Sequence, residues 1–305
     1  MQDYVLTTAM LSKHYGRSKV LSDVSLHVPK GSVYGIVGKN GAGKTTLIRL
    51  ICGLQEPTSG SFTLYGADKS DRQILRARRR MGAVIETPAI YLDMTAEDNL
   101  KQQCLILGLP TYDSIPEVLS LVGLSDTGRK KAKHFSLGMK QRLGIAVALM
   151  GDPDLLILDE PTNGLDPQGI VEIRELILKL NRERNITVMI ASHILNELSR
   201  VATHYGFLNE GRLVKEIATD DLEAACRKCL AVTVNDTKLL ALVLDEMGVE
   251  YEILSEREAY LYGEISPSSL VLSLSKRGGE LLSSHERNET LETYFINLVG
   301  GKQHD

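Results

Sequence analysis

The sequence predicts an α/β domain built on a parallel sheet, followed by a small α+β unit. A β-branched strand pattern, a glycine-rich loop and a helical pattern follow one another over residues 32–51. An apolar run over residues 155–158 ends in two carboxylates, as expected of a parallel strand buried on both faces. Beyond residue 216 the patterns follow the order β-α-β-β-α-β, which is typical of a ferredoxin-like unit.

Length and composition fit two domains of an ordinary globular protein. The chain has 305 residues, 43% of them hydrophobic, and a net charge of -4. This charge gives no reason to expect nucleic acid as a partner. No apolar run approaches the roughly 18 residues that span a bilayer, and a cytoplasmic location is expected. Cys226 and Cys229 form an isolated CxxC, which we interpret as two unpaired thiols near a domain boundary.

Two strand patterns precede the glycine-rich loop. They cover residues 4–8 and 20–28, and residues 12–16 are expected to form a loop between them. Tyr15 in that loop could stack on an adenine face or cover the edge of the sheet. The residues alone leave both interpretations open.

The central motif reads G-K-N-G-A-G-K-T-T over residues 38–46. It fits G-x-x-x-x-G-K-[ST] between a strand and a helix, the pattern of a loop that binds a nucleoside triphosphate. Glycines let backbone N–H groups turn inward, the lysine reaches the β- and γ-phosphates, and the following threonine ligates magnesium. The residues expected to contact the nucleotide are Gly38, Asn40, Gly41, Gly43, Lys44, Thr45 and Thr46.

The next segment alternates between strand and helix patterns. A strand is expected over residues 61–65, a helix over 71–80 and a strand over 81–85. Pro88 ends the last of these elements, because it disfavours helix at the residue before it. Residues 95–150 are mostly helical in pattern, so a helical subdomain of about 87–150 is predicted within the α/β domain.

Candidate catalytic groups stand at two further strand ends. In open parallel sheets ligands bind beyond the carboxyl ends of the strands, so Asp159 and Glu160 should lie near the phosphate loop. Asp159 is suited to hold magnesium, and Glu160 to orient or deprotonate an attacking water. His193 follows the strand pattern at 186–191 and could bridge to the γ-phosphate and sense whether it is present.

Together these motifs resemble the ATP-binding subunit of an ABC transporter over residues 4–213. The resemblance rests on Tyr15, residues 38–46, F-S-L-G-M-K-Q-R at 135–142, residues 155–160, N-G-L-D at 163–166 and His193. It implies a P-loop NTPase cassette with a RecA-like core of mixed sheet, an antiparallel β subdomain and an α-helical subdomain. The implied domains are 1–216 for the cassette and 217–305 for the accessory unit.

The resemblance also assigns roles to single residues. Tyr15 would stack on adenine, His193 would be the switch histidine, and Asp166 would belong to a loop that crosses a dimer interface. Lys44, Glu160 and His193 would then act at the γ-phosphate.

Residues 136–140 correspond by this resemblance to the signature loop of the family, and they predict a second phosphate-binding site, or cradle. Ser136, Gly138 and the start of a helix at Gln141 would form it. In the family this cradle completes the site of the opposite subunit. The implied assembly is two copies closed head to tail over two ATP molecules with Mg²⁺, held at the inner face of the membrane by integral-membrane permease subunits.

Two departures from the commonest family pattern are informative. The signature reads S-L-G-M-K rather than S-G-G-Q, but it keeps the serine and the second glycine. Glu86 stands where most members carry a glutamine that touches magnesium and the membrane partner. A carboxylate there would bind the metal more strongly and add negative charge near the γ-phosphate. With I-E-T-P at 85–88, the chain resembles exporters of peptide antibiotics, including lantibiotic self-protection and bacitracin-type resistance systems.

Three alternatives belong beside this interpretation. Soluble ABC-type ATPases that act on ribosomes or DNA usually carry two cassettes, coiled-coil inserts or basic extensions, and this chain shows none of them. A small-molecule kinase would leave the signature stretch and His193 unexplained. An ABC exporter for a different substrate is the third, because the membrane subunit chooses the cargo.

The accessory unit shows no catalytic motif. Strands are expected at 230–234, 250–254, 259–263 and 280–284, and helices at 237–247, 267–276 and 289–299. Apolar residues recur at helical spacing in the last helix, at Leu291, Tyr294, Phe295 and Leu298. This stripe is expected to dock either on its own domain or on the sister subunit.

Overall fold

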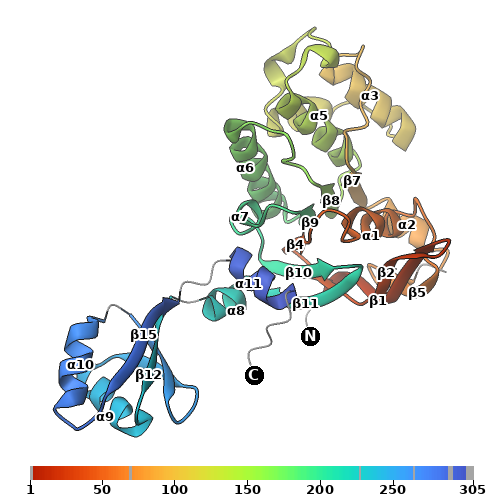
Figure 1. Cartoon of the computed structure of the whole chain (residues 1–305). Coiled ribbons are helices and arrows are strands. Elements are labelled where there is room, and N and C mark those ends of the chain that lie inside the picture. Colours follow the sequence, from red (N-terminus) through yellow and green to blue (C-terminus); the bar gives the residue numbers. More distant parts are fainter. Residues whose placement is uncertain (1–2, 69–70, 227, 264, 288–290, 300–305) are drawn as a thin grey trace. The chain divides into compact units, whose positions relative to one another are not determined.

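The structure is a computed structural model that describes residues 3–68, 71–226, 228–263, 265–287 and 291–299. Figure 1 shows its elements. The chain divides into two compact units, Met1–Thr219 and Asp220–Asp305. This division falls close to residue 216, where the sequence motifs end.

A six-stranded mixed sheet forms the core of the first unit (Figure 1). Its strands lie in the order β11-β10-β4-β9-β8-β7, and all neighbours pair in parallel except β10 and β11. The strands are β4 (Val33–Val37), β7 (Met81–Val84), β8 (Leu155–Asp159), β9 (Thr187–Ser192), β10 (His204–Asn209) and β11 (Arg212–Ala218). The carboxyl ends of β4, β7, β8 and β9 therefore meet at one edge of the sheet, where ligands of such sheets bind.

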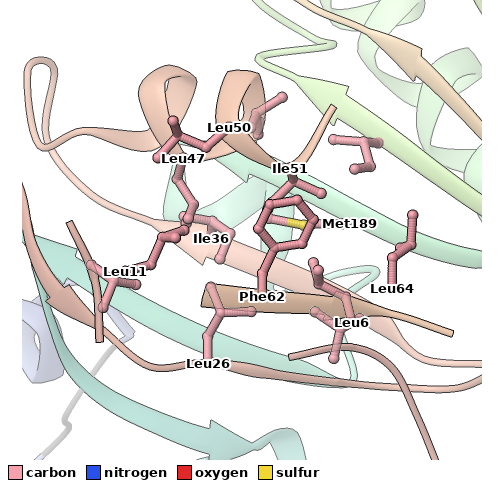
Figure 2. Packing of buried hydrophobic residues seen from close by; sticks show 14 of the residues in the cluster. Leu6, Leu11, Leu26, Ile36, Leu47, Leu50, Ile51, Phe62, Leu64 and Met189 are labelled. Carbon is pink, nitrogen blue, oxygen red and sulfur yellow. The ribbon is translucent and has the colours of Figure 1, made fainter. Parts of the chain in front are cut away.

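A smaller antiparallel sheet packs on the other side of helix α1 (Lys44–Ile51). Its strands are β1 (Tyr4–Tyr15), β2 (Ser18–Val24), β3 (His27–Pro29), β5 (Ser59–Leu64) and β6 (Ala67–Asp68). Leu47, Leu50 and Ile51 of α1 belong to one hydrophobic cluster with Phe62 of the small sheet and Met189 of the large one (Figure 2). Because α1 packs against residues of both sheets, the residues at its start are held firmly.

The predicted loop at 12–16 is wrong, because β1 continues to Tyr15. That residue pairs with Ser18 of β2, so only a two-residue turn separates the strands. Register shifts on both sides of Lys13 let the two strands stay paired up to the turn.

The single strand predicted for 20–28 is also wrong. The Thr8 hydroxyl donates to the Val24 carbonyl at 2.8 Å and accepts from the Leu26 amide at 3.0 Å. These side-chain bonds replace ladder bonds, and Asp23 next to them has a φ of +54°. The segment therefore splits into β2 and β3.

Helices form the insert between β7 and β8 (Figure 1). They are α3 (Ala96–Leu107), α4 (Ile115–Leu121) and α5 (Leu137–Leu149), joined by short 3₁₀ turns at Ser125–Thr127 and Ala132–His134. The Thr95 hydroxyl accepts from the Asp98 amide at 3.1 Å and so caps α3. A Cβ on Gly82 of β7 would lie 2.4 Å from the Ala148 carbonyl oxygen, so α5 approaches the sheet at van der Waals contact.

Three further helices complete the first unit. The helix predicted for 71–80 is only α2 (Ile74–Arg78), because the Asp71 carboxylate accepts from the Gln73 amide at 2.7 Å and forms a turn there. Helix α6 (Pro167–Arg184) joins β8 to β9, and α7 (Leu195–Leu198) follows β9.

The second unit has one antiparallel sheet in the order β13-β14-β12-β15, with α9 and α10 packed on one face. Its elements are α8 (Thr219–Ala225), β12 (Cys229–Val234), α9 (Thr237–Met247), β13 (Glu250–Ile253), β14 (Glu258–Tyr262), α10 (Pro267–Ser275), β15 (Leu281–Arg287) and α11 (Leu291–Val299). From β12 to β15 the order is β-α-β-β-α-β, and this sheet order is that of a ferredoxin-like unit.

The last helix begins at Leu291, and the predicted start at Glu289 lies outside the described residues. Phe295 is buried, while Leu291, Tyr294 and Leu298 are half-buried. Within the described ranges, no helix has both the length and the apolar character needed to cross a bilayer.

Candidate functional site

The loop at 38–43 connects β4 to α1 and requires glycine at several positions. Gly41 and Gly43 have φ values of +83° and +105°, a region that side chains rarely adopt. A Cβ on Gly38 would lie 2.5 Å from the Leu208 carbonyl oxygen. Asn40 and Gly41 are exposed at the tip of the loop, and Thr46 is half-buried in α1. This backbone can therefore approach a ligand closely.

Lys44 begins α1 and has a side chain that is only 6% exposed. Its Nζ donates to the Gly38 carbonyl at 2.7 Å and lies 3.4 Å from the Lys39 carbonyl oxygen. Glu160 Oε1 lies 3.1 Å from the same Nζ. A buried ammonium needs such partners. Its surroundings are oxygens, the atoms that a triphosphate would also present.

Glu160 links the phosphate loop to the end of β9. Its other carboxylate oxygen, Oε2, lies 2.8 Å from His193 Nδ1, and its amide donates to the Ala191 carbonyl at 2.9 Å. Its φ of +50° costs about 1 kcal/mol or more in a residue that is not glycine. Glu160 therefore makes its contacts to Lys44 and His193 from a strained backbone conformation.

Asp159 is the last residue of β8, and its side chain is fully buried. The Thr45 hydroxyl donates to Oδ2 at 2.7 Å, whereas the buried Oδ1 has no hydrogen-bond partner among the described residues. Burial raises the pKa of this carboxyl; the Thr45 hydrogen bond opposes that shift, and the charge of Glu160 adds to it. The charge of Lys44 lowers the pKa but does not cancel the effect of burial, so the site holds a buried carboxylate oxygen without a hydrogen-bond donor among the described residues.

This pair fits a magnesium ion, which takes oxygen ligands in octahedral geometry. Asp159 Oδ1 and the Thr45 hydroxyl oxygen are the two candidate donors. In the part of the chain that the structure describes, no group of three or more His, Cys, Asp or Glu residues could hold a metal. Such a sparse protein shell suits Mg²⁺, which usually keeps waters and takes substrate phosphates as further ligands.

Glu86 follows β7 at the same edge of the sheet and has a φ of +59°. Its side chain is 56% exposed, and Oε1 lies 2.7 Å from Arg49 Nη2. Its charge helps to raise the pKa of Asp159, so it lies within electrostatic reach of that carboxyl. Arg49 was not predicted to have a role, although it stands one helical turn after Thr45 on α1.

Tyr15 lies at the end of β1 with 44% of its surface exposed. Its hydroxyl donates to Gln55 Oε1, and Lys13 Nζ lies 5.2 Å from the centroid of its ring. Neither Gln55 nor Lys13 was predicted to have a role. Lys13 had no such signal, because residues 12–16 were expected to form a loop, in which side chains do not alternate as they do along a strand.

Ser136, Gly138 and Asp166 form a second group in the first unit. The Ser136 hydroxyl accepts from the Met139 amide at 3.2 Å, and Asp166 Oδ1 accepts from the Gly169 amide at 3.1 Å. A Cβ on Gly138 would lie 3.9 Å from the Gly169 Cα, so the starts of α5 and α6 lie together. No hydrogen bond or ion pair joins Ser136 or Asp166 to Lys44 in the described ranges.

The predicted helix start at Gln141 is wrong, because α5 begins at Leu137. Ser136 is its N-cap residue, and the cap bond to Met139 starts the helix four residues earlier. Gly138 therefore lies in the first turn of α5, where backbone N–H groups have no partner within the helix.

Comparisons with known proteins agree on one family. Residues 21–163 match the family described as ABC transporter. The chain is 41% identical to the bacitracin transport ATP-binding protein BcrA of Bacillus licheniformis, over 97% of this chain and 98% of that protein. It is 45% identical to the lantibiotic transport ATP-binding protein SrtF of Streptococcus pyogenes, over 70% of this chain and 90% of that protein. A dimeric structure of a bacterial ABC transporter cassette matches with a TM-score of 0.63 and 25% identity, over 70% of this chain and 98% of that chain.

Replacing Asp159 by asparagine should raise the free energy of unfolding at pH 7 without magnesium. The folded pKa of this carboxyl is higher than the ordinary 3.8, so ionisation costs the wild-type chain stability as the pH rises above 3.8. Asparagine avoids that cost and can still accept the Thr45 hydrogen bond. Urea unfolding should show an advantage for Asp159→Asn at pH 7 that shrinks as the pH is lowered toward 3.8.

The matched control for this experiment is Asp113→Asn, a change at an exposed carboxylate. It should leave the midpoint of unfolding unchanged at both pH values. A lower stability of Asp159→Asn at pH 7 would mean that neighbouring cations already compensate the buried carboxylate.

Proposed function

Because this chain belongs to the ABC transporter family, as an ATPase coupled to transport, we propose that it powers the export of antimicrobial peptides such as lantibiotics or bacitracin. The cassette, residues 1–216, supplies the ATPase, and residues 217–305 form an accessory unit. The match to the bacitracin transport protein carries the proposal, since it extends over both units. Export of this kind would give immunity or resistance to the peptide.

Hydrolysis begins in this proposal with a change of partner at Lys44. The lysine now contacts Glu160 Oε1 at 3.1 Å. Phosphate oxygens of ATP would compete for the ammonium and release the carboxylate. Glu160 then accepts a proton from the attacking water, whose oxygen bonds to the γ-phosphorus while the bond to the β-phosphate oxygen breaks. The contact between His193 Nδ1 and Glu160 supports a role for His193 in aligning Glu160 and contacting the γ-phosphate.

We assign Thr45 and Asp159 as the protein ligands of Mg²⁺, with Glu86 as a further candidate. The hydrogen bond of 2.7 Å between Thr45 and Asp159 holds two oxygens together, and the unpartnered Oδ1 supports the assignment. When bound, the ion neutralises charge that develops on the β- and γ-phosphate oxygens. Glu86 would have to leave Arg49 to take part.

The second group of residues supports a site shared between two chains. Ser136, Gly138 and Asp166 lie together, and none is bonded to Lys44 in the described residues. The solved dimeric cassette has the same fold over 70% of this chain. We propose that a second copy supplies this group to the nucleotide held at Lys44.

The proposed contact with the permease subunits is a hollow lined by residues of α2, β7, α3, α5 and the segment after Pro88. It has a volume of about 750 Å³. Tyr91, Ile106 and Leu107 line it and are exposed apolar side chains. Exposed apolar patches of this kind mark interaction sites. A cytoplasmic segment of an integral-membrane permease would hold the chain at the inner face of the membrane.

The variant Glu160→Gln should bind ATP but hydrolyse it at least about a hundredfold more slowly, because the amide cannot accept the proton. Closed dimers should then accumulate with ATP and magnesium, and light scattering coupled to gel filtration measures them. If the variant stays monomeric at saturating ATP and magnesium, closure by this chain alone is refuted.

Mixing two inactive variants should restore ATP hydrolysis. Lys44→Ala removes the phosphate contact of one chain, and Ser136→Arg blocks the cradle of the other. In a mixed dimer, one site combines both lesions and the other combines intact Lys44 with intact Ser136. Activity should therefore return on mixing, and each variant alone should lack it. Persistent inactivity in proven mixed dimers would place Lys44 and Ser136 at different nucleotides.

The variant Glu86→Gln should keep much of its ATPase activity and change the coupling to transport. Glutamine can still accept the Arg49 hydrogen bond but lacks the charge that acts on Asp159. ATP hydrolysis of the purified chain and peptide resistance of cells that carry the whole transporter are the two readouts. An unaltered resistance phenotype removes the special role of this carboxylate.

A further inference from the structure

Two side chains hold the exposed ring of Tyr15, and the nucleotide motifs include neither of them. We propose that Gln55, aided by Lys13, is a positioning residue that fixes the Tyr15 ring for stacking on the nucleotide base. This inference rests on the proposed function, in which Tyr15 contacts adenine.

The turn that carries Tyr15 belongs to a hairpin that touches the phosphate loop. Tyr15 pairs with Ser18 at the end of the hairpin. Val20 follows on the same strand, and its carbonyl oxygen would lie 3.0 Å from a Cβ on Gly43. Tyr15 is therefore held within a few residues of the loop that would contact the phosphates.

Gln55 joins this hairpin to the segment that leaves α1. The Tyr15 hydroxyl donates to Gln55 Oε1, and the half-buried Gln55 stands directly after Leu54. The Leu54 amide in turn donates to the Arg49 carbonyl at 2.9 Å, which ties the turn to the helix. The helix that starts with Lys44 therefore also supports, through Leu54 and Gln55, the hydroxyl end of the Tyr15 side chain.

Lys13 supports the same arrangement from the strand. Its Nζ donates to the Glu56 carbonyl at 2.6 Å and lies 5.2 Å from the Tyr15 ring centroid. A cation at that distance is attracted to the face of the ring. With Lys13 at one face and 44% of Tyr15 exposed, the rest of the ring remains accessible to a flat ligand.

Fixing the ring before the nucleotide arrives should increase affinity. A surface tyrosine that is free to rotate would lose rotamer entropy on stacking, and a prior hydrogen bond removes part of that cost. The effect should be confined to the base, because among the described residues no hydrogen bond joins Gln55 to the phosphate loop. A ligand without a base therefore separates positioning of the ring from general support of the site.

The experiment compares the affinity of the full chain for a non-hydrolysable ATP analogue and for inorganic tripolyphosphate by calorimetry. Gln55→Ala should weaken binding of the analogue about three- to tenfold, the usual effect of losing one hydrogen bond. Binding of tripolyphosphate should stay the same. Tyr15→Phe should match Gln55→Ala, and the double variant should be no weaker than either single variant.

The matched control is Glu56→Ala, which removes an exposed side chain next to Gln55 but keeps the carbonyl that Lys13 contacts. Its affinities should equal those of the wild-type chain. Equal losses for both ligands in Gln55→Ala, or additive losses with Tyr15→Phe, would overturn the inference.

One more variant separates this inference from the proposed function. If Tyr15→Ala binds the analogue as tightly as the wild-type chain, both the stacking role of Tyr15 and the positioning role of Gln55 are refuted. The ATPase proposal would survive that result, provided that Lys44→Ala abolishes binding of both ligands.

Discussion

The parallel pairing of β4, β9 and β8 is the constraint on which the whole site depends. Val37 pairs with Ser192, and Asp159 pairs with Ala191, so three strands end at nearly the same level. The phosphate loop, the carboxylates and His193 follow these ends and meet there. A slip of one residue in a strand would turn its side chains to the opposite face, and complete burial of all three strands opposes such a slip.

The site itself is built at the expense of stability. Within the described ranges, Asp159 keeps a buried oxygen without a hydrogen-bond partner, and Glu160 adopts a positive φ. Partial compensation comes from the ion pair between Glu160 and Lys44, but buried ion pairs seldom repay their desolvation. Such unfavourable features are typical of functional sites, and the ligand proposed for this one is a magnesium triphosphate.

Helix α1 connects the chemistry at the sheet edge to the rest of the first unit. Its first two residues are the proposed phosphate and metal contacts, Arg49 contacts Glu86, and the turn after it holds Tyr15. Apolar contacts with residues of both sheets keep this helix in place (Figure 2). A displacement of α1 would therefore change the proposed contacts to the base and the phosphates together. It would also move the segment after β7, which leads to the proposed permease surface.

The sequence by itself determined the elements whose signals are local. The glycine spacing around Lys44, the apolar run before Asp159 and the strand before His193 each lie within a few residues, so pattern and spacing suffice. Only the tertiary structure decided the extension of β1 to Tyr15 and the pairing of Tyr15 with Gln55, 40 positions away. Such contacts depend on strand register and helix packing, because residues far apart in the chain meet only after the sheets have formed.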